Sequence, residues 1–513
     1  MRVRCWRSIR SRGLHTSLAR QRAEWNPRLH IWWNLALPAR IMPPMLRKGI
    51  ALAGLVLLML ALFPPTLSLY QLTGEEALQG QLRGLVHWFH TAIRPQPDLA
   101  PHAPMEQAAV SAFGVNTFLQ NEVLPEVRER SLQMISDAGI DFIRQEFPWE
   151  DIEINGKGDF VDRRNDVDGD GEIDALDAWA KYDNIVDLAE ENDVEIVARL
   201  GNPPAWTRAL TNTVGTNAPP DNFEDFGDFV AAVADRYEGR IGYYQVWNEP
   251  NGNDEWGLQD VNPEAYSELL CVAYRRIKEE DADAVVLAGA LTPTVALEGR
   301  NLNDLIYLER MYDAGAGNCF DVMSAQGYGL WSGPTDRRLR PSVINYPHNL
   351  FIRDLMVQHG DAHKPIWIGE MGWNVAPPEL PPIYGRVTEE QQARYAVQAF
   401  ERARDEWPWI GVVNYWFFKR PDNSEKDQTW YYFRMLEPDF TALPVWNAVG
   451  QYAADPPSLE PRAELFYVWQ RWRAALFLVG GALTFFSLLV WLAPEVTQRS
   501  LRAGVVSSTS TSG

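Results

Sequence analysis

The sequence predicts an α/β fold, a (β/α)8 TIM barrel flanked by one N-terminal and one C-terminal transmembrane helix. Between residues 110 and 455, short apolar runs of strand character alternate with helical periods. The chain of 513 residues also carries two long apolar runs without a charge. Alternating strands and helices form a parallel sheet with right-handed crossovers, and eight such units suit a closed barrel.

The expected strands are residues 112–116, 142–145, 195–200, 242–247, 285–290, 321–326, 366–369 and 411–417. The expected helices include residues 226–236, 263–280, 302–314, 388–406 and 441–454. A doubly wound open sheet is the alternative. That fold calls for a glycine-rich phosphate turn after its first strand, and Gly114-Val115-Asn116 is not such a turn.

Residues 49–70 and 474–493 are the two expected transmembrane helices. Each holds about the 20 apolar residues that cross a bilayer, and Trp469, Trp472 and Trp491 flank the second as interfacial anchors. A cleaved signal peptide is an alternative for the first run. The Arg-rich, acid-poor first 30 residues also resemble a mitochondrial presequence, and a start at Met42 or Met45 is a further alternative.

The distribution of charge sets the expected orientation. All lysines and arginines of the first 70 residues precede Gly49, against the single acid Glu24, so the positive-inside rule places the N-terminus in the cytoplasm. The second helix returns the C-terminal tail to the same side. The protein is then expected in the cell membrane, with both termini cytoplasmic and the catalytic domain extracytoplasmic.

The remaining segments follow from these boundaries. We expect a basic cytoplasmic segment at 1–48, a juxtamembrane linker at 71–109, a barrel at 110–455, a linker at 456–473 and a disordered tail at 494–513. The net charge is −21, and the part between the two apolar runs is more acidic still, which argues against nucleic acid as a partner. Cys271 and Cys319 fall in the extracytoplasmic part, where a disulfide could form.

Two glutamates stand at the ends of predicted strands. Glu249 lies in Tyr244-Gln245-Val246-Trp247-Asn248-Glu249-Pro250-Asn251, and Glu370 lies in Pro365-Ile366-Trp367-Ile368-Gly369-Glu370-Met371-Gly372. Glycoside hydrolysis requires two carboxyl groups that face each other across the scissile bond. The eight histidines lie away from the predicted strand ends, so neither a His-rich zinc site nor a Ser-His-Asp triad is indicated.

These motifs resemble those of the clan A glycoside hydrolases, retaining enzymes with both glutamates on the fourth and seventh strands. Within the clan, residues 110–455 most resemble family 39 and family 5-like members. The resemblance implies that Glu249 is the acid/base, that Glu370 is the nucleophile, and that Asn248 binds the sugar 2-hydroxyl. It places Arg144 beside the nucleophile, where a guanidinium keeps a carboxylate ionised.

The resemblance also assigns three aromatic contacts. Tyr328 matches a tyrosine that contacts the nucleophile, Trp416 matches the tryptophan beneath the glycone sugar, and Trp206 is a candidate sugar contact. Gln326 stands where many relatives have histidine, which is a departure within the nucleophile's hydrogen-bond network. Arg337, Arg338 and Arg340, after the sixth strand, either recognise an acidic sugar or form ion pairs on the acidic surface.

A calcium-binding loop is predicted between the second and third strands. The twelve residues from Asp166 to Asp177 carry acids at the spacing of a calcium loop, with glycine at position six and isoleucine at position eight. The expected ligands are Asp166, Asp168, Asp170, Glu172, Asp174 and Asp177. This calcium ion would be structural, because the resemblance implies that catalysis needs no cofactor.

The function that follows is a membrane-anchored retaining glycoside hydrolase. It would cleave O-glycosidic bonds of an oligo- or polysaccharide by double displacement through a covalent glycosyl-enzyme intermediate. Its expected partners are the carbohydrate substrate and the lipid bilayer. Two alternatives remain: a transglycosylase that uses the same two glutamates, and a non-catalytic glycan-binding membrane protein on the same scaffold.

Overall fold

The computed structural model describes residues 43–101, 104–166, 170–209, 217–458 and 462–492. The chain divides into two compact units. One consists of Leu60–Phe477 and contains the barrel; the other joins Met1–Met59 with Leu478–Gly513. Each unit is described by itself below.

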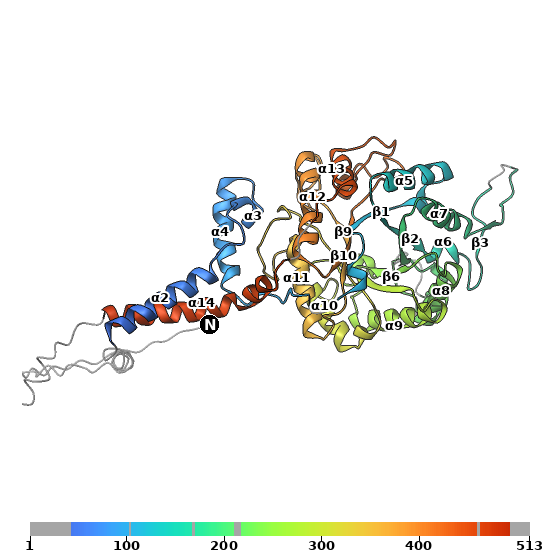
Figure 1. Cartoon of the computed structure of the whole chain (residues 1–513). Helices are drawn as coiled ribbons and strands as arrows, with labels where there is room; N and C mark the ends of the chain where they lie inside the picture. The colour runs from blue at the N-terminus through green and yellow to red at the C-terminus, as the bar shows by residue number, and fades with distance from the viewer. Residues whose placement is uncertain (1–42, 102–103, 167–169, 210–216, 459–461, 493–513) are drawn as a thin grey trace, which may run out of the picture. The chain divides into compact units, whose positions relative to one another are not determined.

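Eight parallel strands form a nearly closed barrel in the larger unit, with helices around it (Figure 1). The sheet order is β7-β6-β5-β2-β1-β10-β9-β8. Parallel bridges from Leu287 to Val322 and from Leu291 to Ala325 bring the two edge strands together. The strands are β1 (Phe113–Thr117), β2 (Phe142–Pro148), β5 (Glu195–Gly201), β6 (Tyr243–Asn248), β7 (Val285–Ala290), β8 (Met323–Gln326), β9 (Ile366–Met371) and β10 (Ile410–Tyr415).

The helices around the strands are amphipathic and begin at recognisable caps. Asn222, Asn262 and Asn303 accept backbone N–H groups at the starts of three of them, and Thr388 forms a capping box with Gln391. The helices of this unit are α3 (Leu69–Thr73), α4 (Leu78–Ala92), α5 (Pro125–Asp137), α6 (Trp149–Ile152), α7 (Ala180–Glu191), α8 (Phe223–Arg236), α9 (Pro263–Glu280), α10 (Asp304–Asp313), α11 (Asn349–Gln358), α12 (Glu389–Glu406) and α13 (Pro444–Ala454).

An apolar layer fills the barrel at the amino ends of its strands. It consists of Phe142, Val197, Leu287, Val322, Trp367 and Val412, one from each of six strands or their entries. The Trp367 ring lies 5.5 Å from that of Phe142 and 4.9 Å from that of Tyr243. Because this end is closed by packed side chains, the polar residues further along the strands gather at the carboxyl ends, where barrel enzymes have their sites.

The predicted strands are all present, each within a few residues of its expected bounds. A two-stranded antiparallel hairpin between β2 and α7, β3 (Val161–Asp162) with β4 (Leu176–Asp177), was not predicted. A disulfide joins Cys271 on α9 to Cys319, which precedes β8. It ties a barrel helix to the entry of the next strand but one.

Two long apolar helices flank the barrel in sequence, α2 (Pro44–Ala61) and α14 (Glu464–Leu492). Both are long and apolar enough to cross a membrane, by length and composition. Their bounds differ from those expected. The first ends at Ala61 rather than near residue 70, because Pro64 and Pro65 cannot continue a helix. The second begins at Glu464, within the segment 456–473 that was expected to be a linker.

Within the smaller unit, α2 and α14 approach each other closely at glycines. A Cβ atom added to Gly54 would lie 3.0 Å from the carbonyl oxygen of Gly480, and one added to Gly480 would lie 2.9 Å from the carbonyl oxygen of Gly54. Small residues at such crossings allow two helix backbones to pack in a bilayer.

Candidate active site

A cavity of about 520 Å3 opens at the carboxyl ends of the barrel strands. Both predicted catalytic residues line it, Glu249 directly after β6 and Glu370 within β9. The other lining residues are Phe118, Asn121, Glu146, Arg199, Asn248, Glu255, Thr292, Pro293, Tyr328, Leu330, Ile344, Ile383, Tyr384, Trp416, Arg420, Trp430 and Phe433. The fourth and seventh strands of the barrel therefore bring the two glutamates into one cavity.

Glu370 is a buried carboxylate with a donor on each oxygen. Arg144 Nη1 donates to its Oε1 at 3.0 Å, and the Tyr328 hydroxyl donates to its Oε2 at 2.6 Å. Burial, and then the negative charge of Glu370, hold the pKa of Tyr328 well above its ordinary value. Tyr328 therefore keeps its proton and remains a donor. These contacts fix the orientation of the Glu370 carboxylate and stabilise its charge.

Arg144 connects four strands at this level of the barrel. Besides Glu370, its guanidinium donates to Gln245 Oε1 at 2.7 Å, to Asn116 Oδ1 at 2.8 Å and to Asn248 Oδ1 at 2.7 Å. Asn116 in turn donates from Nδ2 to the backbone oxygen of Gly369, next to Glu370. The rigid fork of the guanidinium suits this fixed set of acceptors, and a lysine could not satisfy them together.

Glu249 has the opposite environment. Removal from water, and then the negative charges of Glu370 and Glu255, raise its pKa from the ordinary 4.5 to about 8. Gln326 Nε2 donates to Glu249 Oε1 at 2.9 Å. Glu249 therefore carries a proton at neutral pH, while Arg144 and Tyr328 donate hydrogen bonds to the adjacent carboxylate of Glu370. Two carboxyl groups in one cavity thus have environments suited to different roles.

The backbone at this point is also unusual. Trp247 and Glu249 have φ angles of 73° and 39°, in the left-handed region that residues other than glycine rarely adopt. Such conformations cost about 1–3 kcal/mol each and are found where surrounding structure holds a functional group in place. The Glu249 N–H donates to the carbonyl oxygen of Ala290 at 2.9 Å, which secures the turn to β7.

Gln326 lies beside Glu249, and not in the network of Glu370. The resemblance to the family implied that Gln326, which stands where many relatives have histidine, belongs to the hydrogen-bond network of the nucleophile. In the structure its amide contacts the other glutamate. Gln326 is buried at the end of β8, and its side-chain oxygen has no hydrogen-bond partner among the described residues.

The remaining predicted contacts divide into two groups. Asn248 and Trp416 line the cavity. Trp206 is not among the described residues that line it: its indole packs edge-on against Trp149 and donates from Nε1 to the backbone oxygen of Glu153 at 3.0 Å. Trp206, in the turn that follows β5, instead packs against α6 and the residue after it.

The arginines after β8 form ion pairs. Arg337 Nη1 donates to Glu406 Oε2 at 2.9 Å, and Arg338 Nη2 lies 2.6 Å from Asp336 Oδ2. Neither they nor Arg340 are among the described residues that line the cavity. The structure therefore favours the ion-pair interpretation for Arg337 and Arg338 over recognition of an acidic sugar.

Several residues of the cavity were not found from the sequence. Glu255, six residues after Glu249, accepts a hydrogen bond from Asn248 Nδ2 at 3.2 Å, and burial raises its pKa. Arg199 and Glu146 form an ion pair across β5 and β2. Their position at the carboxyl ends of predicted strands was the available indication. Tyr384 and Trp430 come from loops, where no periodic pattern indicates a site.

The predicted calcium loop lies on the β3–β4 hairpin. Asp166 Oδ2 accepts the Gly171 N–H at 2.8 Å, and Asp170 Oδ1 accepts the Glu172 N–H at 2.8 Å. Asp177 Oδ1 accepts the Trp179 N–H at 3.0 Å. Asp168 falls outside the described residues. Within the part of the chain that the structure describes, no three His, Cys, Asp or Glu side chains gather as a metal site.

The parallel barrel, with one glutamate directly after its fourth strand and one within its seventh strand in a single cavity, defines the class of clan A retaining glycoside hydrolases. The family model of cellulase, glycosyl hydrolase family 5, matches residues 104–407. The chain therefore belongs to glycosyl hydrolase family 5, a family of retaining O-glycoside hydrolases.

Several solved structures are similar to the chain at low identity. A GH5_18 enzyme from Streptomyces cattleya, in complex with Manβ1-4GlcNAc, is 15% identical, with a TM-score of 0.50, over 73% of this chain and 92% of that one. A family 39 glycoside hydrolase from Bacteroides cellulosilyticus is 17% identical, with a TM-score of 0.49, over 69% of this chain and 65% of that one. A monomeric β-xylosidase from Caulobacter crescentus is 17% identical, with a TM-score of 0.46, over 67% and 68%. No curated protein sequence matches the chain.

Proposed function

We propose that this protein hydrolyses O-glycosidic bonds with retention of anomeric configuration, by double displacement. One observation carries the proposal: in a single cavity Arg144 and Tyr328 hydrogen-bond to the carboxylate of Glu370, while the pKa of a second carboxyl group, Glu249, is raised to about 8. The first step of a retaining mechanism requires an oriented nucleophile and a protonated acid of this kind.

In the first step, a carboxylate oxygen of Glu370 attacks the anomeric carbon and the glycosidic C–O bond breaks. Glu249 gives its proton to the departing oxygen, so that the leaving group departs as a neutral hydroxyl. In the second step, Glu249, now ionised, takes a proton from water while the water oxygen attacks the anomeric carbon and releases Glu370. Asn248, held by Arg144, lies where the resemblance places the contact with the sugar 2-hydroxyl.

The test compares Glu370→Gln with Glu249→Gln on two substrates, a dinitrophenyl glycoside and a glycoside with a sugar leaving group. Glu370→Gln should lose turnover on both, because no nucleophile remains. Glu249→Gln should lower the turnover of the substrate with the sugar leaving group by about 10²–10⁴-fold. It should slow the first step on the dinitrophenyl glycoside much less, because dinitrophenolate departs without a proton. Equal small losses for both variants would contradict the assignment and favour the glycan-binding alternative.

Product analysis separates hydrolysis from transglycosylation. With an added sugar acceptor, a hydrolase releases mainly the reducing sugar, and a transglycosylase releases a longer oligosaccharide. The aromatic side chains Trp416, Tyr384 and Trp430 offer faces on which sugar rings can stack, and Trp430 is exposed at the rim of the cavity. The cavity surface is therefore suited to a carbohydrate of more than one ring.

We further propose that α2 and α14 cross the cell membrane, with the barrel on the extracytoplasmic side and both termini in the cytoplasm. Support comes from the length and composition of the two helices, from their glycine-lined approach and from the basic segment before α2. The Cys271–Cys319 disulfide is typical of an oxidising compartment. In sealed cells, added protease should digest the barrel and leave tags at the two termini intact. Digestion of the tags before the barrel would indicate the opposite orientation.

Finally, we propose that the loop from Asp166 to Asp177 binds one calcium ion that stabilises the β3–β4 hairpin, on the strength of its ligand spacing. Chelation by EGTA should lower the thermal midpoint of the wild type. The double variant Asp166→Asn/Asp170→Asn should begin from that lower midpoint and no longer respond to EGTA. An identical response of the wild type and the variant would show that the effect of EGTA does not involve this loop.

A further inference from the structure

Helix α4 has one side packed on the protein and one apolar side that is exposed. Gly80, Gly84, Thr91 and Ala92 are buried. Leu78, Leu82, Val86 and Phe89 are exposed, at 65%, 55%, 60% and 37% of their surfaces. Because these four follow one another at intervals of four, four and three residues, they form one stripe along the helix. We call Leu78, Leu82, Val86 and Phe89 the α4 stripe.

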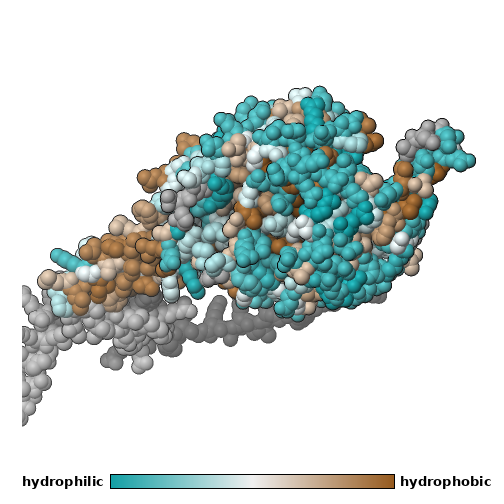
Figure 2. Space-filling model, turned by 45° about the vertical axis from the view of Figure 1, so that its right-hand side comes forward, coloured by the Kyte–Doolittle hydropathy of each residue, from teal (hydrophilic) through white to brown (hydrophobic). Residues whose placement is uncertain are grey.

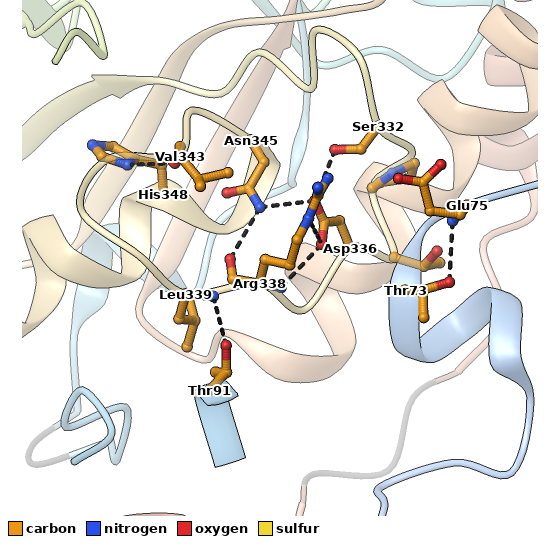
Figure 3. A network of polar contacts seen from close by, with 12 residues as sticks. Thr73, Glu75, Thr91, Ser332, Asp336, Arg338, Leu339, Val343, Asn345 and His348 are labelled. Atoms are coloured by element: carbon orange, nitrogen blue, oxygen red, sulfur yellow. Dashed lines mark hydrogen bonds and ion pairs between the residues drawn. The ribbon is translucent and has the colours of Figure 1, made fainter. Parts of the chain in front are cut away.

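The packed side of α4 is fastened at several points, so the direction of the stripe is fixed. Gly84 lies so close to α3 that a Cβ atom added there would meet the Thr73 side chain at 2.5 Å. At the C-terminal end of α4, Thr91 Oγ1 accepts the Leu339 N–H at 3.3 Å (Figure 3). At the end of α3, the Gly333 N–H donates to the Gly74 oxygen at 3.3 Å. Both contacts reach the loop that follows β8.

Helix α3 holds the pair to the barrel. The Tyr70 hydroxyl donates to Gln398 Oε1 at 2.8 Å, and Tyr395 donates its hydroxyl to Glu76 Oε1 at 2.9 Å, both toward α12. Arg394 on the same helix forms an ion pair with Glu76. The α3–α4 hairpin is thus a fixed part of the larger unit, which turns its apolar stripe away from the barrel.

The stripe is continuous with the apolar part of α14. The Phe89 ring meets that of Phe477 edge-on, with 6.0 Å between centroids, and Phe477 belongs to the uncharged run of α14. One residue earlier, the Trp88 ring lies 5.6 Å from the Arg473 guanidinium. Further large apolar side chains are exposed in the same unit: Phe63 and Leu67 between α2 and α3, and Leu465, Val468 and Trp472 in the first turns of α14. In Figure 2 most of the barrel surface is hydrophilic, whereas the long apolar helices are hydrophobic.

Polar side chains border the α4 stripe on one side. Gln79, Arg83 and His90 are exposed along one edge of the helix, next to Val86. An apolar stripe with a polar, partly basic edge is the pattern of helices that lie in the plane of a bilayer, with apolar side chains in the acyl boundary and basic groups near lipid phosphates. Trp88 is amphipathic and suits the interfacial level.

We propose that α4 is a lipid-binding element, which lies in the interface of the extracytoplasmic leaflet with the α4 stripe among the acyl chains. The proposal rests on the proposed crossing of α2 and α14, and adds a third contact between the protein and the bilayer. The loop after β8 that α4 holds also supplies Tyr328, Leu330 and Ile344 to the active-site cavity. Contact with lipid thus supports one wall of that cavity.

The test measures lipid exposure in the full chain, reconstituted in vesicles of phosphatidylcholine with phosphatidylglycerol. A Cys5→Ser background leaves Cys271 and Cys319 paired, and single cysteines carry a nitroxide label. The test position is Leu82. Arg83 is the matched control on the polar edge of the same helix, Ile306 on α10 is the water-exposed control, and Leu55 on α2 reports membrane crossing.

The label at position 82 should collide with oxygen, which concentrates in lipid, and should lose most of its collisions with a water-soluble nickel chelate relative to position 306. Position 83 should remain accessible to the chelate. A label at 82 as accessible to the chelate as the one at 306, with 55 shielded, would overturn lipid binding by α4 and favour a protein partner on the stripe. A chelate-accessible label at 55 would overturn the membrane crossing and the α4 proposal with it. Neither result depends on glycosidase activity.

Discussion

At the scale of single residues, the site depends on the different surroundings of two chemically identical side chains. Glu370 is buried beside a guanidinium and a phenol, both of which donate to it. Glu249 accepts a hydrogen bond from the neutral amide of Gln326, and its pKa is raised by burial and by the charge of Glu370. The difference arises from neighbours contributed by β1, β2, β6 and β8, and the identity of the two side chains plays no part in it.

The raised pKa of Glu249 predicts a pH-dependent cost in stability. Between pH 4.5 and about 8 the folded protein keeps a proton that the unfolded chain has lost, so this group makes stability fall as pH rises through that window. Glu249→Gln is neutral at every pH and should remove the cost. Its thermal midpoint should exceed that of the wild type at pH 7, and the difference should vanish at pH 4. A constant difference at both pH values would contradict the raised pKa.

The hydrogen bond from Gln326 predicts the direction in which the pKa of Glu249 should change when Gln326 is replaced. Its donated hydrogen bond lowers the pKa of Glu249 against the larger effect of burial. Gln326→Met removes the donor at similar size, so the pKa should rise further. The alkaline limb of the kcat/KM profile should move to higher pH. Gln120→Met, which removes an amide bonded to Glu146 instead, should leave the limb in place; a downward shift in Gln326→Met would contradict the argument.

At the scale of elements, the loop after β8 joins the cavity to the α3–α4 hairpin. Asp336 at its centre is fully buried. Its carboxylate accepts hydrogen bonds from Ser332 Oγ at 2.9 Å, Asn345 Nδ2 at 2.9 Å and the Arg338 guanidinium (Figure 3). The loop is therefore held by an internal carboxylate as well as by the contacts to the hairpin.

Removal of that carboxylate should loosen the cavity wall. Asp336→Ala leaves Arg338 and Asn345 without their acceptor and should lower the free energy of unfolding by about 3 kcal/mol. Because Tyr328, Leu330 and Ile344 lie in or beside this loop, KM should rise by a larger factor than kcat falls. Ser342→Ala, at an exposed position of the same loop, is the control. An unchanged KM in Asp336→Ala would show that the wall does not depend on this network.

The Cys271–Cys319 disulfide is a second connection between elements. It links residues 48 positions apart on α9 and before β8, and the closure of a loop of this length restricts the unfolded chain by roughly 4 kcal/mol in the chain-entropy model. Cys271→Ser/Cys319→Ser should lose up to that amount in denaturant unfolding. Reduction of the wild type should reproduce the loss, and should leave the double variant unaffected.

At the scale of the whole molecule, the chain combines a barrel with a pair of apolar helices whose packing depends on two glycines. Gly480→Leu places a side chain where the backbone of α2 lies and should separate the two helices. Gly481→Leu is the matched control, since a Cβ atom there meets nothing within 4 Å. Spin labels at the exposed Leu52 and Leu488, in the Cys5→Ser background, should show a longer distance in Gly480→Leu alone. Equal distances in both variants would contradict this helix contact.

The sequence by itself determined the barrel, the order of its strands and the positions of Glu249 and Glu370. Strands buried on both sides are apolar throughout and helices follow a period of 3.6 residues, so local patterns suffice to find them. Parallel strands place their carboxyl ends together, so residues at those ends share a site. Arg144, Asn248, Tyr328 and Trp416 were found in the same way, with the help of the family's motifs.

Only the tertiary structure decided the raised pKa of Glu249, because hydration and neighbouring charges depend on distances in space. It also placed Gln326 beside Glu249, turned Trp206 away from the cavity and added Glu255, Tyr384 and Trp430. The pairing of Cys271 with Cys319 and the exposure of the α4 stripe were likewise undecided by the sequence. Each depends on which surfaces of distant segments meet, and local periodicity carries no information about that contact.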